Sequence, residues 1–184
     1  MTWFNCVCRK FVGCTAVAAY GLVLLILVFF TPVQSSETLP QPEGDVILTV
    51  SGNIKNTNTG GAAVLDRNML KGLPQETLVV VTPWTEGNVT FVGPLISDVL
   101  TMVDAGDAAT LKAVALDEYA VEIPTEDVQK YKVILAMTMG GKDLDAQDMG
   151  PLWVIYPWTD QHPELQDEKY HGRSIWQLSA IEVQ

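Results

Sequence analysis

The sequence predicts an α+β fold, a mixed and mainly β domain with few short helices, preceded by an N-terminal hydrophobic helix. Three observations support this fold class. Short runs of β-branched and apolar residues, separated by Gly and Pro, recur through residues 46–184, whereas segments with helical periodicity are few and short. The runs are not separated by regular helices, which argues against a βαβ array. An apolar run from Phe11 to Phe30 stands apart from the rest of the chain.

The N-terminal segment has the features of a membrane-targeting sequence. Arg9 and Lys10 precede the apolar run, which is uncharged and long enough to span a bilayer. A basic flank on this side predicts export of the chain beyond the apolar run. Residues 1–35 are expected to be a cleaved signal peptide or an N-terminal membrane anchor, and both alternatives stay open. Residues 36–45 are expected to form a linker, and residues 46–184 a domain in the periplasm or another extracytoplasmic space of a bacterium.

The predicted domain is acidic and free of cysteine. All 22 acidic residues lie after Ser36, together with every basic residue except Arg9 and Lys10. Such a surface repels nucleic acid and anionic lipid head groups, so membrane contact is expected only through the N-terminal segment. All three cysteines lie in that segment. Cysteine nucleophiles, cysteine zinc sites and iron–sulfur clusters are therefore excluded for the domain.

Short β-branched and aromatic runs predict the strands. Residues 110–124 are expected to form two strands with a turn at Asp117 and Glu118, and residues 132–139 to form a hairpin arm with the Gly140-Gly141 turn. The stretch VVVTPWTEG predicts a strand over residues 79–81 that leads into a loop. The other strands are expected at residues 45–52, 88–93, 151–157 and 174–183.

Three short helices are predicted from capping and turn signals. In residues 65–74, Asp66 is the expected N-cap. Residues 94–106 are expected to form the longest helix, with Pro94 in its first turn. Thr125 is expected to cap a following helix of one to two turns.

Five stretches succeed one another in an informative order: FVGPLISDVL, DEYAVEIPTEDV, GGKDL, GPLWVIYPW and SIWQLSAIEV. Together they resemble the motifs of the oxidoreductase molybdopterin-binding domain, the fold of sulfite oxidase, plant nitrate reductase and the catalytic subunit of bacterial methionine sulfoxide reductase. The matching patterns include W-x-G-x-x-L-x-x-L-L for the first stretch and G-x-P-[IL]-R-[LV]-V-x-P for the fourth. The resemblance spans nearly the whole predicted domain. It implies a sulfite-oxidase-type fold, a molybdopterin cofactor and oxidoreductase activity.

The chain departs from the family pattern at the position of the metal ligand. Small bacterial relatives carry C-V-T-x-W-S, in which the cysteine thiolate ligates molybdenum. The matching stretch here is VVTPWT, with Val80 at the cysteine position and Thr82, Trp84 and Thr85 in register. Molybdenum suits a soft sulfur donor, and valine has no lone pair to offer.

Basic residues that would hold a pterin phosphate are replaced as well. Trp153 stands where the family has arginine, and Ile175 or Trp176 where it has lysine. The domain has two arginines, Arg67 and Arg173. The targeting segment also suggests the general secretory route, which threads unfolded chains, rather than the twin-arginine route of preloaded enzymes. We therefore expect no cofactor, although the resemblance keeps molybdopterin as an alternative.

Aromatic residues fall at positions that resemble the cofactor cleft of the family. One hypothesis is that they line an emptied or repurposed pocket that stacks on a flat or apolar ligand, and the alternative is that they pack in the core and its rim. His162 and His171 are expected to be ordinary histidines of a surface loop. We expect no catalytic residue and no metal ligand. The candidate cleft comprises Val80, Thr82, Trp84, Thr85, Tyr119, Trp153, Tyr156, Trp158 and Arg173.

The sequence supports two functions. The first is a non-catalytic exported module that binds a small ligand, or a partner such as a periplasmic or membrane signalling protein; the replaced cysteine and bases favour it. The second is a molybdopterin-dependent oxidoreductase that holds its metal without a protein thiolate, which the order of the motifs favours.

Overall fold

The computed structural model describes residues 38–184. The predicted N-terminal hydrophobic helix, with its signal-peptide and anchor alternatives, lies outside the described residues. No helix within residues 38–184 is both long and apolar enough to cross a bilayer. The described part of the expected linker contacts the domain, because the Leu39 amide donates to the Thr57 carbonyl (3.2 Å) and the Gly44 amide donates to the Asp66 carboxylate (2.9 Å).

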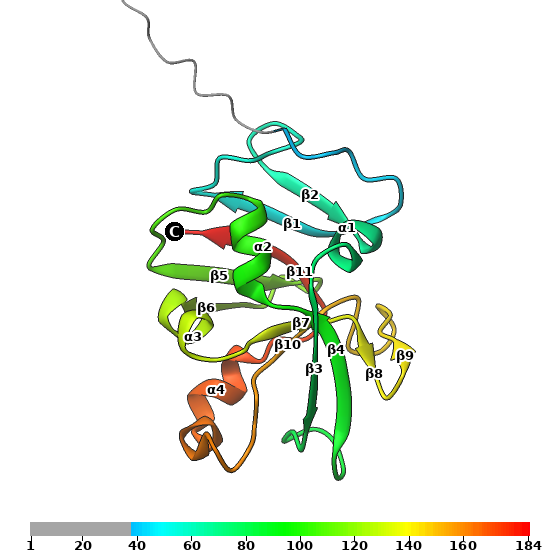
Figure 1. Ribbon diagram of the computed structural model, residues 1–184, viewed down its shortest axis with the longest axis vertical. Helices are drawn as coiled ribbons and strands as arrows, with labels where there is room; N and C mark the ends of the chain where they lie inside the picture. Colours follow the sequence, from blue (N-terminus) through cyan, green and yellow to red (C-terminus); the bar gives the residue numbers. More distant parts are fainter. Residues whose placement is uncertain (1–37) are drawn as a thin grey trace, which may run out of the picture. The chain divides into compact units, whose positions relative to one another are not determined.

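A five-stranded sheet brings the first and last strands of the domain together (Figure 1). β1 (Val46–Gly52) is parallel to β11 (Leu178–Val183), and every other pair in the order β2–β1–β11–β5–β6 is antiparallel. Alternate residues of β1, Leu48 and Val50, are fully buried. The remaining strands are β2 (Ala63–Asp66), β5 (Thr110–Ala115) and β6 (Ala120–Pro124).

A four-stranded antiparallel sheet forms an arm. In Figure 1 its β3–β4 hairpin extends away from the five-stranded sheet. The arm packs closely on a two-stranded sheet of β7 and β10, since a Cβ at Gly93 would clash with the Leu135 carbonyl. The strands of the arm are β3 (Gln75–Val80), β4 (Val89–Pro94), β8 (Thr138–Met139) and β9 (Lys142–Asp143), and the smaller sheet contains β7 (Ile134–Ala136) and β10 (Trp153–Ile155).

The helices are short. They are α1 (Arg67–Lys71), α2 (Ile96–Met102), α3 (Thr125–Lys130), a 3₁₀ turn η1 (Pro163–Gln166) and α4 (Glu168–Arg173). Asp66 caps α1 as expected, because its carboxylate accepts from the Met69 amide (2.8 Å). The mainly β, α+β fold predicted from the sequence is confirmed.

Three local expectations are wrong. Pro94 ends β4 instead of opening α2, which begins two residues later. Thr125 does not cap α3; its hydroxyl is buried without a hydrogen-bond partner within the described residues, and Pro124 takes the N-cap position. Leu65 opens the stretch expected to be helical, but it lies in the strand β2, which runs to the cap residue Asp66. A short strand and a short helix meet there, and residue propensities alone do not fix the boundary between them.

Candidate functional site

The loop after β3 is held in a defined shape by two threonines. The Thr82 hydroxyl lies 2.9 Å from the Thr85 hydroxyl and accepts a hydrogen bond from the Trp84 amide (3.2 Å), while the Thr85 amide donates to the Thr82 carbonyl (3.3 Å). Thr82 is buried. These bonds fold the loop into a compact turn that fixes the position of Trp84.

Trp84 is the centre of an aromatic cluster. Its ring centroid lies 5.7 Å from that of Trp153, 5.9 Å from Trp158 and 5.7 Å from Trp176. The ring of His171 is 6.1 Å away at 71°. All four neighbours are tilted or edge-on to Trp84, the arrangement that aromatic quadrupoles favour. The cluster joins the loop after β3 to β10 and α4.

Two cavities flank this cluster, and the first lies between the loop after β3, the β5–β6 turn and α4. Its volume is about 540 Å³. Trp84, Trp176 and Tyr119 supply aromatic walls, and Asp117 and Glu168 supply carboxylates. No lysine or arginine of the described chain lines it. A cavity of this size, with apolar walls and a few polar groups, matches what small-molecule sites require.

The second cavity, of about 620 Å³, lies on the other side of the same loop. Val79, Val81, Thr82 and Trp158 line it together with residues of the segment after β10. Pro83 and His171 line both cavities. The loop tip and His171 therefore separate the two spaces.

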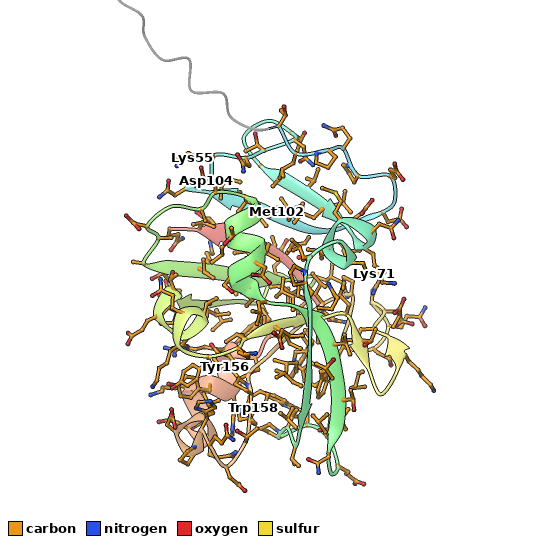
Figure 2. The ribbon with its side chains drawn as sticks, viewed as in Figure 1. Lys55, Lys71, Met102, Asp104, Tyr156 and Trp158 are labelled. Atoms are coloured by element: carbon orange, nitrogen blue, oxygen red, sulfur yellow. The ribbon has the colours of Figure 1, made fainter. Side chains whose placement is uncertain are left out.

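The structure distributes the predicted cleft residues over the two cavities and the core. Trp84 and Tyr119 line the first cavity, and Thr82 and Trp158 line the second. Trp153 and Tyr156 are fully buried and belong to the core. Figure 2 shows Tyr156 and Trp158 beside α4.

The buried indoles also have their polar atoms satisfied. Trp153 Nε1 donates to the Ser174 carbonyl (3.0 Å), and Trp158 Nε1 donates to the Leu165 carbonyl (2.9 Å). A core tryptophan needs such a partner, and these bonds tie β10 and the segment after it to η1 and to the end of α4.

Val80 points into the hydrophobic core, with 2% of its surface exposed. It lines neither cavity, whereas its neighbours Val79 and Val81 line the second one and are exposed. The alternation of the strand explains the difference, because successive side chains point to opposite faces.

Arg173 is held by a buried carboxylate. Its Nη1 donates to Asp127 Oδ2 (2.7 Å), and the Tyr156 hydroxyl donates to the same oxygen (2.9 Å). Burial, followed by the nearby Asp127 carboxylate, raises the pKa of Tyr156, so the phenol stays a hydrogen-bond donor. Arg173 therefore links α4 to α3 and, through Asp127, to Tyr156, which directly follows β10.

Sequence reasoning missed several residues of the first cavity, among them His171, Trp176 and the carboxylates of Asp117 and Glu168. His171 is on α4 rather than in a loop, and its Nε2 is buried with no hydrogen-bond partner within residues 38–184. The motif pattern places Trp176 only at the lysine position of the family, whereas in the structure it lines the first cavity. The Asp167 N-cap and the charged last turn are the signals that predict α4.

The described chain offers little to a metal or an anion. Residues 38–184 contain no group of three or more His, Cys, Asp or Glu side chains that could hold a metal ion. Both arginines are engaged, since Arg67 donates to the Met137 and Leu144 carbonyls and Arg173 to Asp127. The carboxylates of Asp117 and Glu168 at the first cavity repel anions.

Comparisons with known proteins point to one fold. Residues 47–160 match the model of the family described as oxidoreductase molybdopterin binding domain. Among solved structures, the chain is similar to the sulfane dehydrogenase SoxCD from Paracoccus pantotrophus, with 16% identity and a TM-score of 0.52. The similarity covers 74% of this chain and 37% of that chain, so this chain spans well under half of the length of that protein. No curated protein matches the chain.

Proposed function

The chain belongs to the oxidoreductase molybdopterin-binding domain family, and we propose that it serves there as a non-catalytic, exported binding module. Its ligand on this proposal is a small molecule that enters the cavity at Trp84. A periplasmic or membrane signalling protein is the partner that would read the bound state. The observation that carries the proposal is the environment of Val80.

The residues do not fit a bound molybdenum. By resemblance, Val80 occupies the position of the thiolate ligand, and it is packed in the core, where it lines neither cavity. The described chain has no cysteine, and no polar side chain replaces the sulfur at this position. A metal at Val80 would have neither a protein donor nor access to solvent.

The residues do not fit a pterin phosphate either. A phosphate requires cationic or amide donors, and bidentate arginine serves it best. Arg173 is neutralised by Asp127 at 2.7 Å, and Arg67 lies at another site, where it donates to backbone carbonyls. No lysine lines either of the two described cavities beside Trp84. We therefore derive no redox step for this chain.

The aromatic walls support binding of a ligand. Trp153 and Trp158 back the ring of Trp84, and the Thr82–Thr85 turn holds its backbone, so the ring is positioned before any ligand arrives. A wall that is already ordered loses little entropy when it binds. The cavity of about 540 Å³ has room for a small organic molecule.

Substitution of Trp84 tests this function. The Trp84→Phe variant keeps an aromatic face, and Trp84→Ala removes it. We expect both variants to fold, with ligand binding kept in the first and lost in the second, as measured by differential scanning fluorimetry against a small-molecule library. A collapsed fold in Trp84→Ala, together with unchanged ligand binding in variants of Tyr119, would assign these aromatics to packing alone.

The alternative function is that of a molybdopterin-dependent oxidoreductase, which family membership favours. A redox assay on protein purified from an exporting host, grown with and without added molybdate, separates the two. The proposed module shows no molybdate-dependent turnover. Turnover that rises with molybdate would establish the enzyme.

A further inference from the structure

The first cavity presents aromatic faces that the core does not cover. Trp176 is 41% exposed and Tyr119 is 55% exposed, whereas Trp153 is fully buried. Trp84 and Trp176 stand at 80° to each other with their ring centroids 5.7 Å apart. These two nearly perpendicular indoles and Tyr119 line the same cavity. Exposed aromatics that line a concave space indicate a binding site.

Two carboxylates line the same space and have no cationic partner. Asp117 and Glu168 take part in none of the salt bridges within residues 38–184. Lys169, the residue next to Glu168, pairs with Asp167 instead (3.9 Å). The cavity has no lining lysine or arginine. Its negative charge is therefore left for a ligand to balance.

We propose that this cavity binds a small organic cation whose charge is spread over methyl groups, a quaternary ammonium. The inference rests on the proposed binding function and names the ligand class for the same site. Aromatic faces attract such a cation through their quadrupoles. The carboxylates of Asp117 and Glu168 add a favourable field, and the acidic surface of the domain raises the local concentration of cations.

Other ligand classes fit the cavity less well. An anion meets two carboxylates and no balancing base. A primary ammonium is compact and strongly hydrated, so it loses more hydration on entering a space with aromatic walls. A neutral apolar molecule gains from the indoles but draws nothing from the charges of Asp117 and Glu168. A quaternary ammonium uses both features of the cavity.

A pair of isosteric probes tests the charge requirement. Choline and its neutral carbon analogue, 3,3-dimethylbutan-1-ol, have nearly the same shape. Each is titrated into the full chain in detergent, with binding followed by tryptophan fluorescence and by calorimetry. We expect choline to bind at least about tenfold more tightly than the neutral analogue, the ratio that cation–π and carboxylate attraction together provide. Its affinity should fall as the salt concentration rises.

Variants then locate the site. Trp176→Leu should weaken choline binding about tenfold, while Trp176→Phe keeps most of it. The single substitutions Asp117→Asn and Glu168→Gln should each weaken binding as well. Asp107→Asn is the matched control, because this exposed aspartate lines none of the cavities beside Trp84 and its substitution removes the same formal charge. The control variant should bind choline like the parent.

Three results would overturn the cation proposal: equal affinity for the two probes, no choline binding by the parent chain, or equal weakening by Asp107→Asn. Equal affinity for the two probes would still be consistent with the proposed binding function, but with a ligand of another class. Failure of the proposed function itself has a separate sign, which is molybdate-dependent turnover in the redox assay.

Discussion

Replacing Arg173 by methionine should destabilise the domain, because Arg173 is the cation of a buried pair. Asp127 Oδ2 accepts from both Arg173 (2.7 Å) and the Tyr156 hydroxyl (2.9 Å). The side chains of Arg173 and Asp127 are 21% and 11% exposed. Removing one member of a buried pair costs about 3–5 kcal/mol. Partial exposure and the remaining Tyr156 bond lower our expectation to about 2–3 kcal/mol.

Urea unfolding, followed by tryptophan fluorescence, measures this cost on the full chain in detergent. The matched control is Lys112→Met, which breaks the exposed pair with Glu182 (3.5 Å) and should cost less than about 1 kcal/mol. Adding Asp127→Asn to Arg173→Met should recover part of the loss, since the uncompensated charge is gone. An Arg173→Met variant as stable as Lys112→Met would refute the view that Arg173 is a structural anchor.

Three further predictions concern the arm, the acid range and the metal position. Gly93→Ala should prevent folding, because its Cβ would clash with the Leu135 carbonyl. Gly172→Ala is the control: no atom lies near its added Cβ, so it should be neutral or stabilise α4 by up to about 1 kcal/mol in the same urea assay. Hydrogen bonds from backbone amides, that of Met69 foremost, lower the pKa of Asp66 in the folded protein. The ionised carboxylate therefore stabilises the fold at a pH above the unfolded-state pKa of about 3.9, and this stabilisation is lost as the pH falls through the lower pKa of the folded state. The free energy of unfolding should therefore fall less between pH 7 and pH 3 for Asp66→Asn than for the parent chain. An equal fall in the two proteins would contradict this. In Val80→Cys, maleimide labelling mapped by mass spectrometry should be at least about tenfold slower in the folded than in the unfolded protein, because the site is buried; rapid labelling would show that it opens to the solvent.

The α+β class was predictable because the hydrophobic periods of the strands are clear. β1, β4, β5, β6 and β11 lie within a residue or two of the expected positions at most ends, except that β11 begins four residues after the predicted start. Boundaries failed where two short elements meet, as at Pro94, which reads as a first-turn residue and ends a strand instead. The local pairing of β5 with β6 was predictable from the turn between them, whereas pairing between distant strands was not. The parallel contact of β1 with β11 joins opposite ends of the domain, and no local signal specifies it.

The candidate site was predictable only in part. Trp84 and Tyr119 were selected from motif positions, and they line the first cavity. His171 and Trp176 were missed, because whether a side chain reaches a cavity depends on the course of α4 after β10. Arg173 was selected as a ligand-binding residue, but its side chain is held by Asp127, a contact between residues 46 positions apart. A tertiary partner at such a distance leaves no pattern in the local sequence.

The most direct test of the central claim is the molybdenum content of the chain, measured by mass spectrometry together with the fluorescence of released pterin. The protein should be purified from its native membrane or periplasm, with a cysteine-bearing family member as the positive control. The environment of Val80 and the engaged arginines predict neither metal nor pterin above background. Near-stoichiometric molybdenum with pterin would contradict the account, and would require a coordination that uses no protein thiolate.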